Sequence, residues 1–160
     1  MTARDYVAIA AGYIDDVLNG EIPACKWVRL ACERQRRDLE RSDWQWRFDP
    51  ERAAHVCRFV ELLPHVKGEW ARGRGTIVLS PWQCFVLTTV FGWVNEAGHR
   101  RFKKAYTEIP RKNAKSTLSS GVGLYLLTAD NEPGAEVYSA ATTRDQAKIV
   151  WGDARAMTVA

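Results

Sequence analysis

Residues 105–117 read AYTEIPRKNAKST, and the order of residue types in this stretch decides the fold class expected for the whole chain. A short run that favours a β-strand, residues 105–109, leads through a proline into a polar, basic turn. Lys115, Ser116 and Thr117 then open a helical pattern whose apolar residues share one stripe. Strand, loop, Lys-Ser/Thr and helix is the order typical of phosphate-binding loops.

The chemistry of such a loop is anion binding, because backbone N–H groups and the positive end of the helix dipole point at the ligand. Lys115 is expected to contact the outer phosphates of a nucleotide, and the Ser116 hydroxyl to coordinate a magnesium ion. The standard pattern GxxxxGK[ST] has glycines, which take positive φ freely, where this chain has Ile109 and Ala114. The pattern alone therefore leaves open a second interpretation, in which a basic turn caps a helix and Lys115 is a solvated surface charge.

The run PRKNAKS, residues 110–116, resembles the deviant Walker A loop of bacteriophage terminase large subunits, the DNA-packaging ATPases. An arginine four positions before the lysine is common in that family, and Arg111 stands there in this chain. The resemblance implies that Arg111 stabilises the charge that develops on the γ-phosphate, which makes Arg111 and Lys115 the expected catalytic residues. It also implies that Lys112 and Asn113 shape the loop.

Residues 79–87 read LSPWQCFVL and resemble the adenine-recognition segment of terminases, which is related to the Q motif of helicases. The amide of Gln83 offers a donor and an acceptor, which match the N6 amine and N7 of adenine. Taken alone, Gln83 is better explained as an exposed polar residue on the first turn of a buried helix. Its place ahead of a phosphate-binding loop, an order shared with ASCE-type ATPases, favours the adenine role. The expected nucleotide-binding residues are Gln83, Arg111, Lys112, Asn113, Ala114, Lys115, Ser116 and Thr117, with ATP and Mg²⁺ as cofactors.

The composition is that of an ordinary soluble domain. The chain has 160 residues, of which 46% are hydrophobic and 26% charged, and its formal net charge is +4. This mild basicity is compatible with a nucleic-acid partner without requiring one. No apolar run of about 18 residues occurs. The N-terminus lacks the layout of a signal peptide, so we expect no membrane span and a cytosolic location.

The four cysteines, at positions 25, 32, 57 and 84, are far apart and include no CxxC pair. His55 and Cys57 form one pair of possible metal ligands, whereas zinc sites usually combine two close pairs. Free thiols, buried or half-buried, are therefore the favoured interpretation.

The N-terminal part is predicted to form helices over residues 4–18, 24–41 and 50–63. Asp49 followed by Pro50 marks the start of the third helix. The second helix has an arginine-rich face that offers contacts to a nucleic-acid backbone, but a solvated face paired with the acids of the same helix is favoured. Those acids are Glu33, Asp38 and Glu40.

Residues 64–75 contain three glycines and mark a break, which we take as the boundary between a helical segment, 1–68, and the nucleotide-binding part, 69–160. In the second part, strands are expected at 76–79, 105–109 and 135–141, and helices from Pro81 to about residue 92, from 115 to about 128, and from about 142. Asp130 and Glu132 are not expected to be the Walker B acid, because they follow a helical stripe and not a buried strand.

Two further stretches leave a choice between DNA contact and local structure. Residues 100–104 hold four basic side chains that either enter the strand as solvated charges or lie along a DNA track. Residues 136–147, EVYSAATTRDQA, resemble the second strand and following helix of terminase ATPases, comparable to motif Ia of helicases. Four residues would then lie at the edge of a parallel sheet where ligands bind and could contact DNA: Thr142, Thr143, Arg144 and Gln146. Helix capping by Thr142 or Thr143 explains them at least as well.

Together these patterns predict an α/β fold: a partial parallel sheet with flanking helices, the first half of an ASCE-type P-loop NTPase, preceded by the N-terminal helical segment. The resemblance implies an ATP-driven motor that packages double-stranded DNA into procapsids. It implies as partners DNA, a small terminase subunit, the portal protein of the procapsid and a ring of like subunits. The expected location is the cytoplasm of a bacterial host, with the gene carried by a phage or prophage.

The expected ATPase is incomplete within these residues. A complete site also needs an acidic strand that holds magnesium and a glutamate that activates water, and we recognise neither. A nuclease domain with clustered carboxylates would lie beyond this chain. We therefore expect the intact protein to be an ATPase and this chain alone to hydrolyse ATP poorly or not at all. Two alternatives stay open: a fragment of another ATP-dependent helicase or translocase, and an inactive prophage remnant that acts at most as an interaction module.

Overall fold

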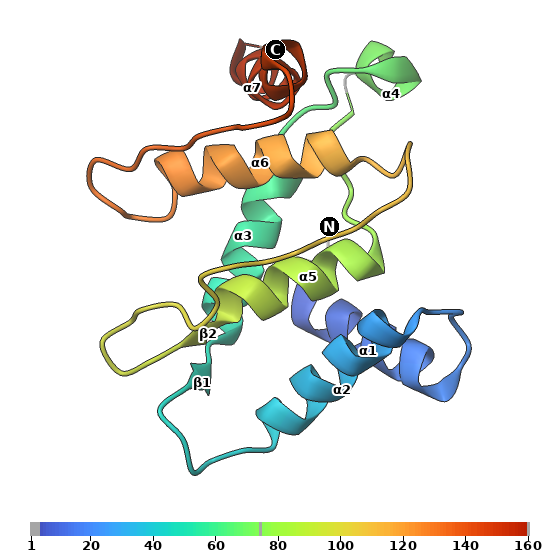
Figure 1. The fold of residues 1–160 in the computed structure, drawn as a ribbon, viewed down its shortest axis with the longest axis vertical. Helices are drawn as coiled ribbons and strands as arrows, with labels where there is room; N and C mark the ends of the chain where they lie inside the picture. The colour runs from blue at the N-terminus through green and yellow to red at the C-terminus, as the bar shows by residue number, and fades with distance from the viewer. Residues whose placement is uncertain (1–3, 74, 160) are drawn as a thin grey trace. The chain divides into compact units, whose positions relative to one another are not determined.

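The computed structural model describes residues 4–73 and 75–159, which form seven helices and two short strands (Figure 1). The elements in chain order are α1 (Tyr6–Asn19), α2 (Lys26–Leu39), β1 (Arg47–Phe48), α3 (Pro50–Leu62), α4 (Gly68–Arg72), α5 (Pro81–Gly92), β2 (Trp93–Val94), α6 (Lys115–Thr128) and α7 (Arg144–Val159). Their contacts define two compact units. Unit 1 comprises the described parts of Met1–Cys57 and Leu79–Ala105, and unit 2 those of Arg58–Val78 and Tyr106–Ala160. The expected domain boundary between residues 68 and 69 stays a prediction.

The helix ends follow from local capping chemistry. The Asp5 carboxylate accepts the N–H of Ala8 at 2.9 Å and begins α1, and Gly20, at φ 87°, ends it in the left-handed conformation that glycine favours. Asp49 accepts the N–H groups of Glu51 and Arg52 at the start of α3. Because these signals are local, the predicted helices agree with the observed ones to within about two residues.

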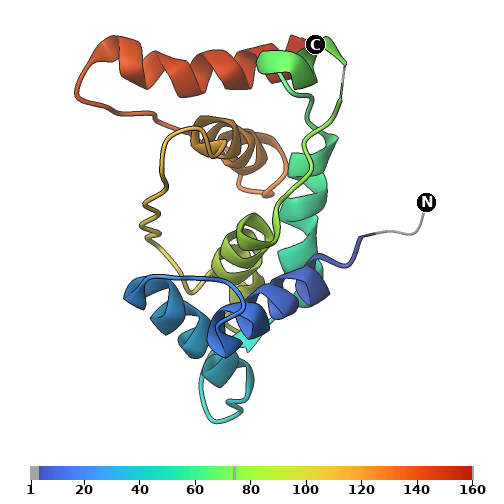
Figure 2. The same ribbon diagram turned by 90° about the vertical axis from the view of Figure 1, so that its right-hand side faces the viewer.

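Unit 1 is built on α5, which packs against α1, while α1 also packs against α2 (Figures 1 and 2). Strands β1 and β2 pair antiparallel, with Phe48 opposite Trp93. The Trp93 indole N–H donates to the Gln35 side-chain oxygen at 2.8 Å, which satisfies a polar group inside this core. Gly92 allows the close approach of Phe48, since a Cβ at position 92 would lie 2.5 Å from the Phe48 ring.

Unit 2 is built on α6, which crosses α7; Figure 2 shows α6 end-on with α7 running across it. Gly121 lets α6 approach α3 closely, because a Cβ there would lie 3.3 Å from Val60 Cγ1. The Phe59 and Tyr125 rings meet edge to face with centroids 5.5 Å apart. Within the described chain, no helix has the length and apolar character needed to cross a membrane.

The predicted parallel sheet is not present in residues 4–73 and 75–159, where the paired strands are β1 and β2 and run antiparallel. Of residues 76–79, only Thr76 forms a bridge, with Pro64, and residues 105–109 and 135–141 form no strand. A parallel strand needs neighbouring strands to accept its backbone hydrogen bonds, and these segments meet none here. Their aromatic side chains are instead exposed, Tyr106 by 90% and Tyr138 by 83%. The sequence patterns also missed α4 and β2.

Candidate nucleotide-binding site

The loop before α6 holds two residues in the left-handed backbone region. Ala114, the N-cap of α6, has φ 54° and ψ 22°, and Lys112 has φ 68°. This region disfavours residues with a Cβ by roughly 1–2 kcal/mol. The side-chain nitrogen of Asn113 donates to the carbonyl oxygens of Pro110 at 3.3 Å and Arg111 at 3.2 Å, which braces the turn. Ala114 therefore adopts the conformation for which the standard motif uses glycine.

The N-terminus of α6 carries backbone donors with no helical acceptor. The first hydrogen bond of the helix joins the Leu118 N–H to the Ala114 carbonyl oxygen at 2.9 Å. The N–H groups of Lys115, Ser116 and Thr117 therefore point out of the helix end. Ala114 supplies no capping side chain, and the first turn contains no acidic residue. This end of α6 is a concentration of partial positive charge.

Three basic side chains add to that charge. Arg111, Lys112 and Lys115 are exposed, and none of them forms an ion pair within the part of the chain that the structure describes. The helix dipole favours negative groups at a helix N-terminus, by about 0.3–1 kcal/mol each, so cations there are unfavourable. An anion bound at this loop would neutralise the excess of positive charge. Phosphate fits the loop best, because each of its oxygens accepts hydrogen bonds from the backbone N–H groups.

Ser116 is the residue placed to meet a metal ion on bound phosphate. It is half-buried on the first turn of α6, and its hydroxyl has no hydrogen-bond partner among the described residues. Mg²⁺ usually takes one or two protein oxygens and completes its shell with phosphate and water. No cluster of three or more His, Cys, Asp or Glu side chains that could hold a metal occurs in residues 4–73 and 75–159. The Ser116 hydroxyl could therefore be the single protein ligand of a Mg²⁺ ion.

Gln83 lies in unit 1, on the first turn of α5, whereas residues 111–117 lie together in unit 2. Its side-chain oxygen accepts the N–H of Ser80 at 2.8 Å, which closes a capping box at the start of α5. Its amide nitrogen has no hydrogen-bond partner in the described chain. The side-chain oxygen of Gln83 therefore caps α5, while its amide N–H₂ group remains available to donate to a ligand. Its adenine role stays a prediction.

The choices left open for two basic or polar stretches are partly resolved. The Thr143 hydroxyl oxygen accepts the N–H of Gln146 at 3.3 Å, so it caps α7 as one interpretation expected.

Arg101 is internal: its Nη1 lies 2.8 Å from the Asp38 carboxylate, and Asp38 is only 1% exposed. The expectation of a solvated Asp38 was wrong, because the pattern of α2 could not reveal a partner so distant in sequence.

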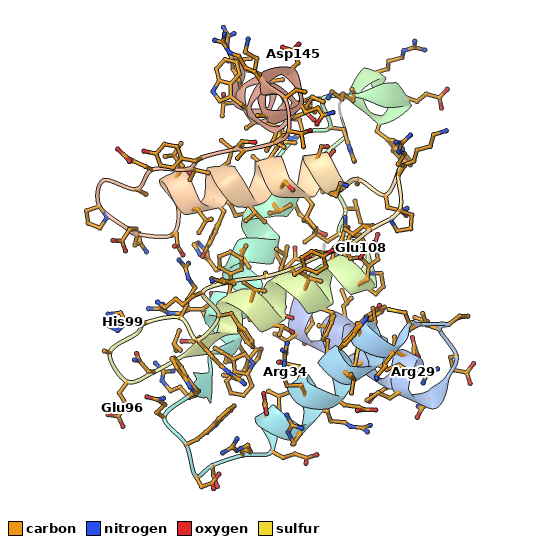
Figure 3. All side chains as sticks on the ribbon, in the orientation of Figure 1. Arg29, Arg34, Glu96, His99, Glu108 and Asp145 are labelled. Carbon is orange, nitrogen blue, oxygen red and sulfur yellow. The ribbon has the colours of Figure 1, made fainter. Side chains whose placement is uncertain are left out.

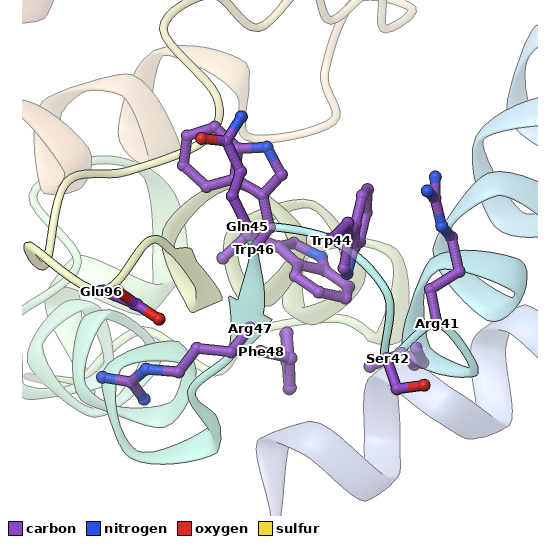
Figure 4. A pocket seen from close by; sticks show the side chains of 10 residues that line it. Arg41, Ser42, Trp44, Gln45, Trp46, Arg47, Phe48 and Glu96 are labelled. Atoms are coloured by element: carbon purple, nitrogen blue, oxygen red, sulfur yellow. The ribbon is translucent and has the colours of Figure 1, made fainter.

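Unit 1 also contains an aromatic pocket of about 360 Å³, shown in Figure 4. Its walls include Trp44, Trp46, Phe48 and Trp93, and the guanidinium of Arg41 lies 4.2 Å from the centre of the Trp44 ring. None of the residues predicted to bind nucleotide lines this pocket. Its aromatic rings were visible in the sequence, but their convergence depends on the pairing of β1 with β2.

Comparison with known protein families matches residues 81–158 to the terminase large subunit, ATPase domain. The match begins at the first residue of α5 and ends in the last turn of α7, so it includes Gln83 and the whole loop 110–117. No curated protein and no solved structure matches the chain. The resemblance inferred from residues 79–87, 110–116 and 136–147 is thereby confirmed.

Proposed function

We propose that this chain, whose residues 81–158 belong to the terminase large subunit ATPase family, supplies the ATP-binding loop of a motor that packages double-stranded DNA. The observation that supports the proposal most strongly is the N-terminus of α6. Its first turn has free backbone donors, no acidic residue and three flanking basic side chains without ion pairs among the described residues. Within a matched ATPase segment, this charge arrangement fits a triphosphate.

Each loop residue has a distinct task in this proposal. Lys115 binds the β- and γ-phosphates, and the Ser116 hydroxyl coordinates Mg²⁺. Arg111 stabilises the negative charge that grows on the γ-phosphate oxygens. Lys112 and Asn113 hold the loop shape, which agrees with the left-handed Lys112 backbone and the two hydrogen bonds of the Asn113 amide. Gln83 donates its amide N–H₂ to adenine.

The proposed fold of the complete ATPase is a P-loop NTPase with a parallel sheet. Residues 105–109 and 135–141 would be two of its strands, each directly before a helix of unit 2. Their exposed apolar side chains support this assignment, because a sheet flanked by helices would bury them. Double-stranded DNA, a small terminase subunit, a procapsid portal and a ring of like subunits are the proposed partners, within a phage-infected or prophage-carrying bacterial cell.

The test is equilibrium binding of a fluorescent ATP analogue with Mg²⁺. Lys115→Ala should weaken binding at least about tenfold, since it removes a charge-assisted contact to phosphate. Lys148→Ala is the matched control, because Lys148 is an exposed lysine of α7 without an ion pair in the described chain. Equal effects of the two changes, or no binding by a folded sample, would favour an inactive remnant instead.

A further inference from the structure

The guanidinium of Arg34 in unit 1 lies in the field of the Asp38 carboxylate but forms no ion pair with it. Arg34 extends from α2 (Figure 3) and stacks on the Phe102 ring, 5.0 Å from its centre. Its Nε is buried without a hydrogen bond, and its terminal nitrogens reach the surface. Within the described residues it forms no ion pair. Proteins normally supply a hydrogen-bond acceptor or an ion pair to a partly buried guanidinium, and Arg34 has neither of these at its Nε.

The surroundings of Arg34 carry an excess of positive charge. Asp38 is the carboxylate among them, and it is already engaged by Arg101 at 2.8 Å and by Arg37 at 3.5 Å. Three guanidinium groups thus share one carboxylate. Partial burial, followed by repulsion from Arg101, lowers the pKa of Arg34. The local field is therefore one that attracts anions.

Two more cations follow Phe102 directly in the chain. Lys103 and Lys104 are exposed, and neither forms an ion pair within residues 4–73 and 75–159. Stacking on Phe102 brings the Arg34 guanidinium beside the run of the chain that contains Lys103 and Lys104. We call these three cations of unit 1 the basic surface. No acidic residue interrupts the run from Arg100 to Lys104.

We infer that the basic surface of Arg34, Lys103 and Lys104 binds the phosphate backbone of double-stranded DNA. The inference rests on the proposed function, in which DNA is the cargo. DNA is favoured as the ligand because its charge is repeated, about one phosphate per 3.4 Å of each strand, and successive cations can each meet one. Lysine and a solvent-reaching arginine act on phosphate as charges without reading sequence, as a motor that moves any DNA requires.

The test measures the affinity of the chain for labelled duplex DNA over a series of salt concentrations, without nucleotide. Arg34→Gln should weaken binding severalfold at low salt and reduce the slope of log K against log salt by about one. The double change Lys103→Gln and Lys104→Gln should reduce the slope by about two. Arg34→Lys, which keeps the charge, should keep the wild-type slope.

The matched control is Arg29→Gln, which removes the same charge from a different face of α2 (Figure 3). It should leave the slope unchanged. An Arg29→Gln effect equal to that of Arg34→Gln, in variants with unchanged circular dichroism, would overturn the inference. So would equal displacement of the DNA by polyglutamate at the same charge concentration, which would point to an acidic protein as the partner.

The outcomes separate this surface from the ATP site. If Lys115→Ala leaves ATP-analogue binding unchanged while Arg34→Gln lowers the salt slope for DNA, the DNA surface stands and the nucleotide assignment falls. If ATP binding depends on Lys115 while no variant of the basic surface changes DNA binding, the nucleotide site stands and the DNA surface is wrong.

Discussion

The Ser120 hydroxyl lies 2.8 Å from the carbonyl oxygen of Val150 and so joins α6 to α7. Ser120 is fully buried, and its hydroxyl also lies 2.8 Å from the carbonyl oxygen of Ser116, one turn earlier in α6. A single side chain therefore connects the first turn of the proposed phosphate-binding helix to the middle of α7.

Ser120→Ala should lower the free energy of unfolding of unit 2 by about 1 kcal/mol, since it removes a buried hydrogen bond between helices. Urea denaturation measures the change. Thr128→Ala is the control, because the Thr128 hydroxyl bonds to the Leu124 carbonyl oxygen of its own helix at 2.7 Å. Equal losses in the two variants would show that the contact with Val150 adds nothing.

Ala114→Gly should raise the free energy of unfolding by about 1 kcal/mol, because glycine adopts the left-handed conformation of this position without the steric penalty of a Cβ. Ala11→Gly, on an exposed position inside α1, should lower it by about the same amount, since right-handed helix favours alanine. Chemical denaturation should therefore show opposite changes in the free energy of unfolding, an increase for Ala114→Gly and a decrease for Ala11→Gly. Destabilisation by both changes would mean that position 114 is not strained.

Asp38→Asn should destabilise unit 1 by about 3–5 kcal/mol, because it leaves Arg101 largely buried without its counter-charge. Trp93 lies within 5.5 Å of the Arg101 guanidinium and offers a fluorescence signal for the unfolding of this core. The exposed neighbour Glu40→Gln should change stability by less than about 0.5 kcal/mol. Similar small effects of both changes would contradict an internal ion pair.

Gln83→Ala should lower stability by about 1 kcal/mol even without nucleotide, since it opens the capping box with Ser80. Gln83→Glu keeps an oxygen that accepts the Ser80 N–H but removes the N–H₂ group proposed for adenine. It should retain more of the stability than Gln83→Ala does, while it weakens binding of ATP. If Gln83→Glu binds ATP as the wild type does, Gln83 has the structural task alone.

Cys25 should be the first of the four thiols to react with iodoacetamide in the folded protein, because it is exposed while Cys32, Cys57 and Cys84 are buried. Burial, with a smaller effect of Glu33, raises the pKa of Cys32 to about 11, so this thiol stays protonated at pH 8 and gains reactive thiolate only as the pH approaches 11. Mass spectrometry of peptides alkylated at pH 8 checks the order. Early labelling of Cys32 without denaturant would contradict the packing of α2.

The helices could be predicted because their ends depend on neighbours in sequence, such as Asp5, Gly20 and Asp49. The start of α6 after loop 110–117 could be predicted for the same reason, because the residues that decide it are contiguous. The role of this loop as a phosphate site stays a prediction. The strands at 105–109 and 135–141 could not be decided from sequence, since a strand exists only with a partner that accepts its hydrogen bonds.

Long-range pairs escaped prediction for a similar physical reason. Nothing in the pattern of α2 indicates that Asp38 meets Arg101, which comes after β2 in the chain. The capping role of Gln83 was also hidden, because the residue type proposed for adenine equally suits the third position of a capping box. The short helix α4 formed inside a glycine-containing break that the pattern assigned to a loop.

Calorimetric titration with ATP, ADP and AMP in the presence of Mg²⁺ tests most directly whether the N-terminus of α6 binds phosphate. Affinity should fall from ATP to AMP by at least about tenfold, because only the outer phosphates meet Lys115 and the first turn of α6. In Lys115→Ala that preference should largely disappear. Equal affinity of wild type for ATP and AMP, or a preference unchanged by Lys115→Ala, would contradict a phosphate-binding loop at residues 110–117.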